Sequence, residues 1–359
     1  MTVSTALITP LLSFIPLSLP NDSTQIFTDI HVSGYAENNE IYPLIKGHPG
    51  HYSTSEHAYT LNQAEIGVRM GEFSVSLFSR YEWYLNYSPD AMLLYGESVN
   101  GQDMQAGKVY DIDLNVEHLV SNGLKLGWSH DWSESFSSYV SVSYLEAREV
   151  MSGRLNGHVQ HLQGQNYDGL LNLNYVYSED VLLDRELSGD QKSHFGYSSD
   201  VGLNWMPTDK WFVSLWAQDV LNAIKWRGVP RTRATADTAT AETDEDGFVS
   251  IRPTVTGRED DTDYTQHLPT KYHSRVSYIA DQNAFGLKSL YVDDLWLVDA
   301  EWFARWNNQL STQVTYNIQS DAIGLKAQWY GLTLGVASDS IDYQDAEHLN
   351  VNIGFGFNI

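Results

Sequence analysis

The chain has 359 residues, and its 46 acidic and 21 basic residues give a formal charge of -25, which argues against nucleic-acid binding because a phosphate backbone requires a basic surface. No run of roughly 20 apolar residues is present, so the sequence predicts no membrane-spanning helix. Cysteine is absent, whereas 22 Tyr and 11 Trp are present, a composition that fits passage through an oxidising periplasm and aromatic girdles at a membrane interface.

The first 24 residues are apolar and interrupted by proline. They resemble the apolar part of a secretory signal, but the first basic residue is Lys46. Pro10, Pro16 and Pro20 would break a helix here. Two interpretations of residues 1–24 stay open, a signal remnant and a mature segment that plugs the lumen of the fold that follows.

From Gln25 onward, apolar and polar residues alternate in one segment after another. This period of two predicts 14 to 16 strands. Short turns are expected at Gly71-Glu72, Asn122-Gly123, Pro207 to Lys210 and Asn307-Asn308. Long connections are expected at residues 38–58, 88–106, 180–192 and 222–268. Short turns at one end and long loops at the other are typical of a membrane barrel.

The last strand, residues 347–359, shows the pattern in its clearest form. Large apolar residues occupy one face: Leu349, Val351, Ile353, Phe355, Phe357 and Ile359. Asn and Gly occupy the other face. A soluble sandwich would place charge opposite its apolar face, whereas a barrel in lipid has an apolar outside and a polar lumen. We therefore predict an all-β fold, a single transmembrane antiparallel β-barrel over residues 25–359, and keep a β-sandwich as the alternative.

Several charged residues fall on the predicted lumen face. They are Arg80, Asp111, Asp113, Glu117, Asp299, Glu301 and Arg305. Rings of carboxylate in a pore favour cations, and arginines facing them sharpen the field. The alternative is that these charges are paired across strands inside a closed lumen.

The long insert at residues 222–268 is strongly acidic. Within it, Glu242, Asp244 and Asp246 alternate before Gly247, which imitates the start of a calcium loop. Pro253 stands where the bidentate Glu of such a loop belongs. A solvated acidic outer loop is the alternative. Calcium is the only cofactor the sequence suggests, and cations on this loop would link it to lipopolysaccharide.

Ser129, His130 and Asp131 contain the residue types of a hydrolase triad. Neighbours on a strand point to opposite faces, so these three side chains cannot form one site. We therefore predict no catalytic residue and no enzymatic activity.

The Asn204–Trp211 turn and the terminal strand resemble those of Gram-negative outer-membrane barrels. From Leu268-Pro269 to the end, seven short strands loosely resemble the long-chain fatty-acid transporter and conjugation-associated barrel families. Those families usually end on an aromatic residue, whereas here Phe357 lies two residues before the final Ile359. The resemblance implies location in the cell outer membrane, barrel architecture and an N-terminal plug.

These patterns favour an outer-membrane channel or transporter that passes a small solute through a polar lumen. The acidic insert and residues 1–24 are the candidate gates. A non-conducting envelope component, which anchors a protein partner through its outer loops, is the alternative, and an outer-membrane enzyme is the third. The partners expected are outer-membrane lipid, lipopolysaccharide and a small-molecule solute.

Overall fold

The computed structural model of the chain describes residues 12–20, 23–162, 167–179, 193–238, 241–243, 249–251 and 254–359. Two helices, α2 (Ile41–Lys46) and α3 (Pro89–Val99), interrupt a long succession of strands. The strands are β1 (Thr24–Ala36), β2 (His57–Met70), β3 (Phe73–Tyr87), β4 (Val109–Ser133), β5 (Phe136–His161), β6 (Tyr167–Tyr177), β7 (Ser193–Thr208), β8 (Trp211–Gln218), β9 (Ala223–Asp237), β10 (Ala241–Thr243), β11 (Val249–Ile251), β12 (Thr254–Gln266), β13 (Lys271–Ala280), β14 (Asn283–Val292), β15 (Leu295–Arg305), β16 (Leu310–Asn317), β17 (Ile323–Trp329), β18 (Leu332–Ser338) and β19 (His348–Asn358).

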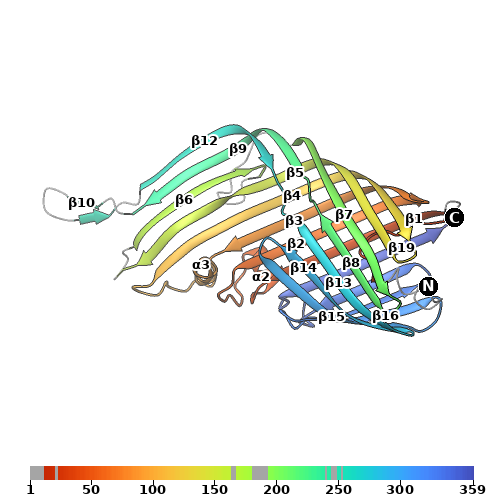
Figure 1. Ribbon diagram of the computed structural model, residues 1–359. Helices are drawn as coiled ribbons and strands as arrows, with labels where there is room; N and C mark the ends of the chain where they lie inside the picture. The colour runs from red at the N-terminus through yellow and green to blue at the C-terminus, as the bar shows by residue number, and fades with distance from the viewer. Residues whose placement is uncertain are drawn as a thin grey trace.

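Antiparallel pairing carries the sheet around a closed ring, which β1 and β19 complete with Thr28 opposite Phe355 (Figure 1). In the described residues the ring can be followed through 16 strands, with β12 outside it along β9. At the level where β5 pairs directly with β7, and β8 with β13, the ring holds 14 strands. The predicted antiparallel barrel of 14 to 16 strands is confirmed.

The outer face of this wall is apolar. Residues that point away from the lumen are exposed: Ile26, Ile66, Leu77, Leu126, Val142, Val276, Leu287, Leu325, Val336 and Ile353. Exposed aromatics gather toward the two ends of the wall, among them Phe73, Trp132, Trp205, Trp306 and Trp329 at one end and Tyr81, Tyr272 and Trp296 at the other. A soluble sandwich would bury such side chains between its sheets, so this surface indicates a barrel wall in lipid.

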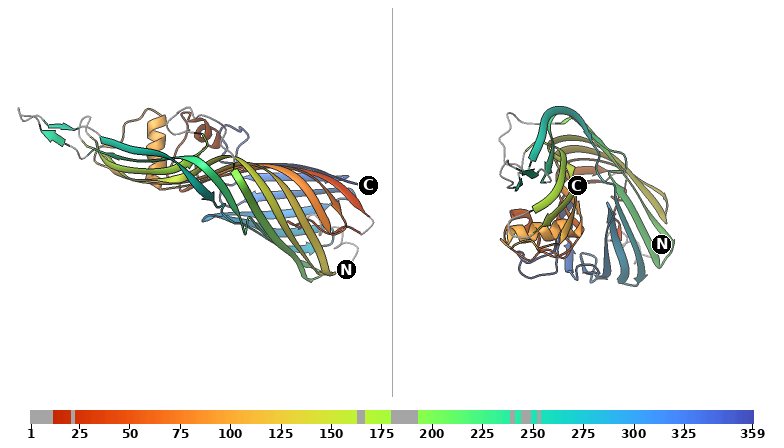
Figure 2. Two further views of the ribbon diagram at one scale, coloured as in Figure 1. Left: turned by 90° about the horizontal axis from the view of Figure 1, so that it is seen from above. Right: turned by 90° about the vertical axis from the view of Figure 1, so that its left-hand side faces the viewer.

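No described helix is long and apolar enough to cross a membrane. The two helices of the described residues lie at the end of the barrel opposite the termini (Figure 2). In α3, Pro89 occupies the first turn, and Ser88 accepts a hydrogen bond from the Ala91 N–H, so the start is well capped. Met92 of α3 then packs with Tyr87 and Ala58 at the strand ends.

Some strands continue far beyond the wall. The outer parts of β4 and β5 (residues 109–118 and 151–161) join β6, β9 and β12 in a curved sheet, which we call the arm (Figure 1). β5 has 26 residues, which corresponds to about 85 Å of extended chain, whereas a membrane strand needs only about 9–11 residues. Residues 222–268, which the sequence indicated as an outer loop, thus form mainly β9 and β12 of the arm.

The expected turn at Asn122-Gly123 is wrong, because both residues lie inside β4 and the hairpin comes between Ser133 and Phe136. A side chain at position 123 would meet the Phe78 ring at 2.2 Å. Glycine is therefore needed here to admit an aromatic ring, and not to turn the chain.

Arm and wall are joined on one side by the continuous strands β4 and β5, and on the other side by a bend between β8 and β9. β8 ends at Gln218, and Asp219 adopts a left-handed backbone (φ 59°) before the chain continues as β9. The return strand bends at the same level: Leu268 N–H donates to Asn222 Oδ1 at 2.7 Å, and Asn222 Nδ2 donates to Leu268 O at 3.0 Å. These reciprocal bonds hold the two bends together.

Candidate functional site

The face of the wall opposite the lipid-facing side chains is polar in strand after strand. Its charged members include Asp29, Glu65, Arg80, Glu82, Lys125, Asp200, Arg275, Lys288, Asp299, Glu301 and Lys326. Charges in this number would be costly in a dry core unless paired. The lumen is accordingly the candidate site, and its charges fall into a packed part and a part open to solvent.

The packed part is centred on four side chains that reach across the lumen. Arg80 of β3 donates two hydrogen bonds to Asp219, at 3.0 and 2.9 Å. Lys271 of β13 lies 2.6 Å from Asp219 and 2.5 Å from Glu82 of β3. All four are buried, at 0–2% exposure. At this level β4, β5, β7 and β8 lie between β3 and β13 in the ring, so this cluster joins separate parts of the wall across the lumen.

Further pairs extend the packed part toward the termini. Arg275 binds Glu301 at 2.9 Å, and Gln313 donates to the same carboxylate at 2.8 Å. Lys288 lies 2.7 Å from Asp299. Each of these pairs joins strands at most two places apart, so they brace the wall locally.

The open part lies along β17 and β1. Asp29 alternates with lipid-facing Ile30, and Lys326 with lipid-facing Leu325, so both charged side chains point into the lumen. Both are nevertheless exposed. Unfilled space therefore lies beside the lumen face on this side of the barrel.

Residues 12–20 lie inside the wall at the end where the termini are found. Leu12 is fully buried against Met206, Phe212 and Phe303, and its carbonyl accepts a hydrogen bond from Arg275 at 2.6 Å. The Phe14 ring lies 4.5 Å from the Arg275 guanidinium.

Two polar contacts hold the same segment to other strands. Asn204 Nδ2 donates to Ser13 Oγ at 2.8 Å, and Ser129 Oγ donates to the carbonyl of Pro16 at 2.8 Å. The segment is thus held by side chains of several strands around the ring.

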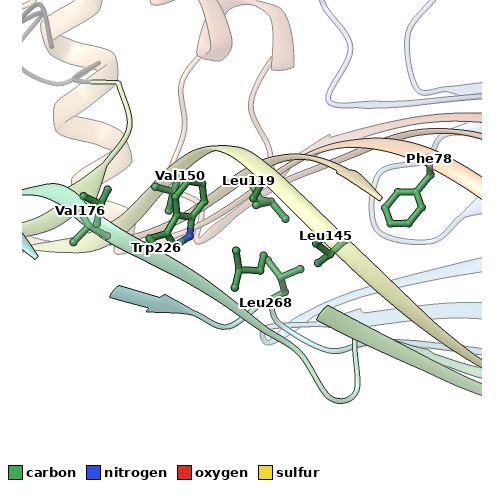
Figure 3. Packing of buried hydrophobic residues seen from close by; sticks show 10 residues of the cluster. Phe78, Leu119, Leu145, Val150, Val176, Trp226 and Leu268 are labelled. Atoms are coloured by element: carbon green, nitrogen blue, oxygen red, sulfur yellow. The ribbon is translucent and has the colours of Figure 1, made fainter. Parts of the chain in front are cut away.

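An apolar cluster lies where the lumen meets the arm. It contains Phe78, Leu119, Leu145, Ala147, Val150, Val176, Ile224, Trp226, Val229 and Leu268. Figure 3 shows Trp226 beside Val150, and Leu268 belongs to the same cluster. Gln266 of β12 reaches across to Glu117 and to the backbone of His118 in β4, at 3.2 and 2.9 Å. β12 and β4 are therefore joined across the base of the arm, and the base encloses an apolar core.

The charges expected in the lumen lie at three levels. Arg80 and Glu301 are in the packed part, and Asp299 and Arg305 share the inward face of β15 with Glu301. Glu117 lies at the arm base. Asp111 and Asp113 continue the same face onto the arm, where Asp113 accepts two bonds from Arg154, at 2.8 and 2.5 Å.

Sequence reasoning missed Glu82, Asp219 and Lys271. Glu82 follows Arg80 on the same face of β3, so the alternation alone could have indicated it. Lys271 opens β13 on the same face as Arg275, so alternation could have indicated it as well. Asp219 follows the end of β8 and lies outside any period. Asp219 meets a partner 139 residues away, a pairing that needs the closed ring.

The structure does not describe the three calcium candidates as a group. Glu242 lies in β10, and Asp244 and Asp246 fall outside the described residues. Among the described residues, no group of three or more His, Asp or Glu side chains could hold a metal ion.

Ser129, His130 and Asp131 point to different partners. Ser129 contacts Pro16, His130 contacts Glu72 at 2.8 Å, and Asp131 accepts from Ser18. They form no shared site.

No protein-family model and no curated protein sequence matches the chain. Among solved structures, the TodX deltaS2S3 mutant, a monoaromatic hydrocarbon channel, is 10% identical with a TM-score of 0.45 over 98% of this chain and 93% of that chain. The Ralstonia pickettii toluene transporter TbuX is 8% identical with a TM-score of 0.43 over 95% of this chain and 90% of that chain. A Pseudomonas aeruginosa FadL homologue is 10% identical with a TM-score of 0.40 over 94% and 88%. The expected resemblance to outer-membrane barrels of the fatty-acid transporter kind is present, but superpositions this loose carry nothing about the lumen or a solute.

Proposed function

We propose that this barrel is a gated passage for a small polar solute across an outer membrane. One observation carries the proposal: Asp29 and Lys326 face the lumen, and their side chains border unfilled space. A wall with lipid-facing apolar residues outside and solvated charges inside provides a polar route through an apolar layer.

The orientation of the barrel supports an outer membrane. Both termini lie at the end where the connections are short, and the arm extends from the other end (Figures 1 and 2). In outer-membrane barrels the short turns face the periplasm and the long excursions face outward. The arm would then project from the cell surface.

Residues 12–20 are the proposed gate. They are held within the lumen by Arg275, Asn204 and Ser129, contacts that use side chains of the wall and leave its strand pairing intact. The segment could therefore leave without opening the ring. The β10–β11 hairpin is a weaker candidate, because it lies at the far tip of the arm (Figure 1).

Planar-bilayer recording tests the passage. We expect small or rare currents from the full chain and large, stable current steps after deletion of residues 12–20. Phe14→Ala, which removes the ring on Arg275, should give more frequent openings than the full chain. Replacing residues 239–253 by a short Gly-Ser linker is the matched control, and its current should equal that of the full chain.

Two outcomes would change the conclusion. Absence of current from both the full chain and the deletion would remove the channel and favour an envelope component that binds a partner through its arm. The length of β4 and β5, 25 and 26 residues, is the observation on which that second function rests. A current that rises only with the Gly-Ser linker would make the acidic insert the gate instead.

A further inference from the structure

Arginines gather on one face of the arm, although the chain is strongly acidic. Strand register places Arg154 of β5 opposite Asn174 of β6, Asn174 opposite Arg233 of β9, and Arg233 opposite Arg258 of β12. These four residues form one row across four adjacent strands, which we call the arginine row. Neighbouring strands lie roughly 4.8 Å apart, so the guanidinium groups are near neighbours.

A second row of neutral donors runs beside the first. It contains Asn156, Asn172, Thr235 and Thr256 in consecutive strands. The two rows line a hollow of about 560 Å³. No carboxylate is among the residues that line it. Guanidinium, amide and hydroxyl groups therefore converge on one open space.

The carboxylates beside the arginine row are too few to neutralise it. Asp113 already accepts two hydrogen bonds from Arg154. Asp260 accepts two bonds from Arg231, both at 2.9 Å, and one from Arg233 at 3.0 Å, with Arg258 at 3.8 Å. Three guanidinium groups thus share a single carboxylate. Glu117, in the same row as Asp260, accepts hydrogen bonds from Ser152 and Gln266. Asp111, Asp168 and Asp237 lie on this face beyond the neutral donors.

The arginines keep donor capacity for a ligand. Arg154, Arg233 and Arg258 are 54%, 45% and 76% exposed. Arg233 and Arg258 stand directly opposite each other, and like charges in that position repel. An anion between them would relieve this repulsion, and the planar fork of arginine suits a phosphate in particular.

We infer that the hollow between the two rows binds the phosphate of a phosphorylated sugar. The arginine row would take the phosphate, and the neighbouring amides and hydroxyls would take sugar hydroxyls. Such a ligand is available as the headgroup of lipopolysaccharide or as a free sugar phosphate. The site lies on the arm and does not depend on passage through the lumen, so its test is separate from the conductance test.

Calorimetry on the full chain in detergent measures the binding, with glucose 6-phosphate as probe and glucose as the neutral comparison. We expect glucose 6-phosphate to bind and glucose not to bind. Arg258→Gln should weaken the affinity about tenfold, because it removes a charged hydrogen-bond donor to the phosphate. Its side chain is the most exposed of the row, so the arm should still fold, and added Arg233→Gln should abolish binding.

Arg227→Gln is the matched control. Arg227 is an exposed residue of β9 that follows buried Trp226, so its side chain points to the opposite face of the arm. Its affinity for glucose 6-phosphate should equal that of the unchanged chain. Equal loss in the control and in the Arg258 variant would overturn the site, because a nonspecific charge effect would then explain the binding.

Vesicles containing lipopolysaccharide distinguish the two sources. Binding to phosphorylated but not to dephosphorylated lipopolysaccharide, with loss in the Arg233/Arg258 variant, identifies the headgroup. Binding of glucose 6-phosphate alone identifies a free solute. Failure of both probes to bind the full chain overturns the inference.

Discussion

Wall and arm share the strands β4 and β5, yet their charged side chains differ in burial and pairing. In the wall, Asp219 is fully buried and has two cationic partners. In the arm, Asp260 is 22% exposed and has three cationic neighbours, of which Arg258 is 76% exposed. A buried pair broken on one side leaves an unpaired charge, whereas an exposed pair is screened by water. Similar contacts therefore stabilise the wall, whereas in the arm they leave the arginine side chains accessible to a ligand.

The largest effect is expected in the wall. Asp219→Asn keeps a residue type that tolerates the left-handed backbone, but it leaves Arg80 and Lys271 without their shared carboxylate. We expect the free energy of unfolding to fall by about 3–5 kcal/mol. Urea unfolding in lipid vesicles measures it. Asp113→Asn, which breaks an exposed pair of the arm, is the control, and equal losses in the two variants would erase the contrast between wall and arm.

A second substitution should loosen the arm and spare the wall. Trp226 is 2% exposed at the core of the arm base, and Trp226→Ala should cost about 3–5 kcal/mol there. The chain has no cysteine, so spin labels introduced at Val255 and Leu334 report the arm-to-wall distance cleanly. Its distribution should broaden in Trp226→Ala. Trp302→Ala, on the outer face of the wall, should leave it unchanged, and broadening there would show that arm and wall loosen as one unit.

A smaller effect sharpens the binding side of the comparison. Asp260→Asn removes the internal counter-charge of three arginines, so the affinity for glucose 6-phosphate should rise several-fold in calorimetry. The conductance of the deletion of residues 12–20 should not change when this substitution is added. Weaker binding would mean that Asp260 positions the arginines more than it competes with the phosphate.

The smallest effect is a dependence on pH. The hydrogen bond from Arg231 lowers the pKa of Asp260, so its contribution is fully present above the unfolded pKa, about 3.9, and is lost as the pH falls through the lower folded value. The label distance should therefore stay constant from pH 8 to 5 and change only below about pH 4. A change near pH 6 would point to another group.

The sequence predicts the wall well because lipid outside and water inside impose a period of two on every strand. Prediction fails where a residue serves another purpose. Gly123 resembles a turn residue but admits the Phe78 ring. The acidic insert reads as a loop because its carboxylates are counted as solvated, whereas Asp260 pairs across strands with Arg231.

The lumen site can be predicted only in part from the sequence, for a similar reason. Alternation places Arg80 and Glu301 on the lumen face, but it gives no distance around the ring. Asp219 and Lys271 are brought together by the direct pairing of β8 with β13. Their contacts with Arg80 and Glu82 of β3 form only across the closed ring. The arginine row likewise depends on the register of four strands, and the intervals along the sequence between its members show no period.

The joint between β8 and β9 has a mechanical consequence. Asp219 and Lys271 flank it, and Thr270 donates to the carbonyl of Asp219 at 3.2 Å. The two bends are tied to each other by Asn222 and Leu268, so they form one joint on this side of the arm, whereas β4 and β5 run from wall to arm without a break. The joint carries two members of the cluster that spans the lumen. A force applied to the far end of the arm by a surface polymer or a neighbouring cell would therefore strain the contacts of Asp219 and Lys271.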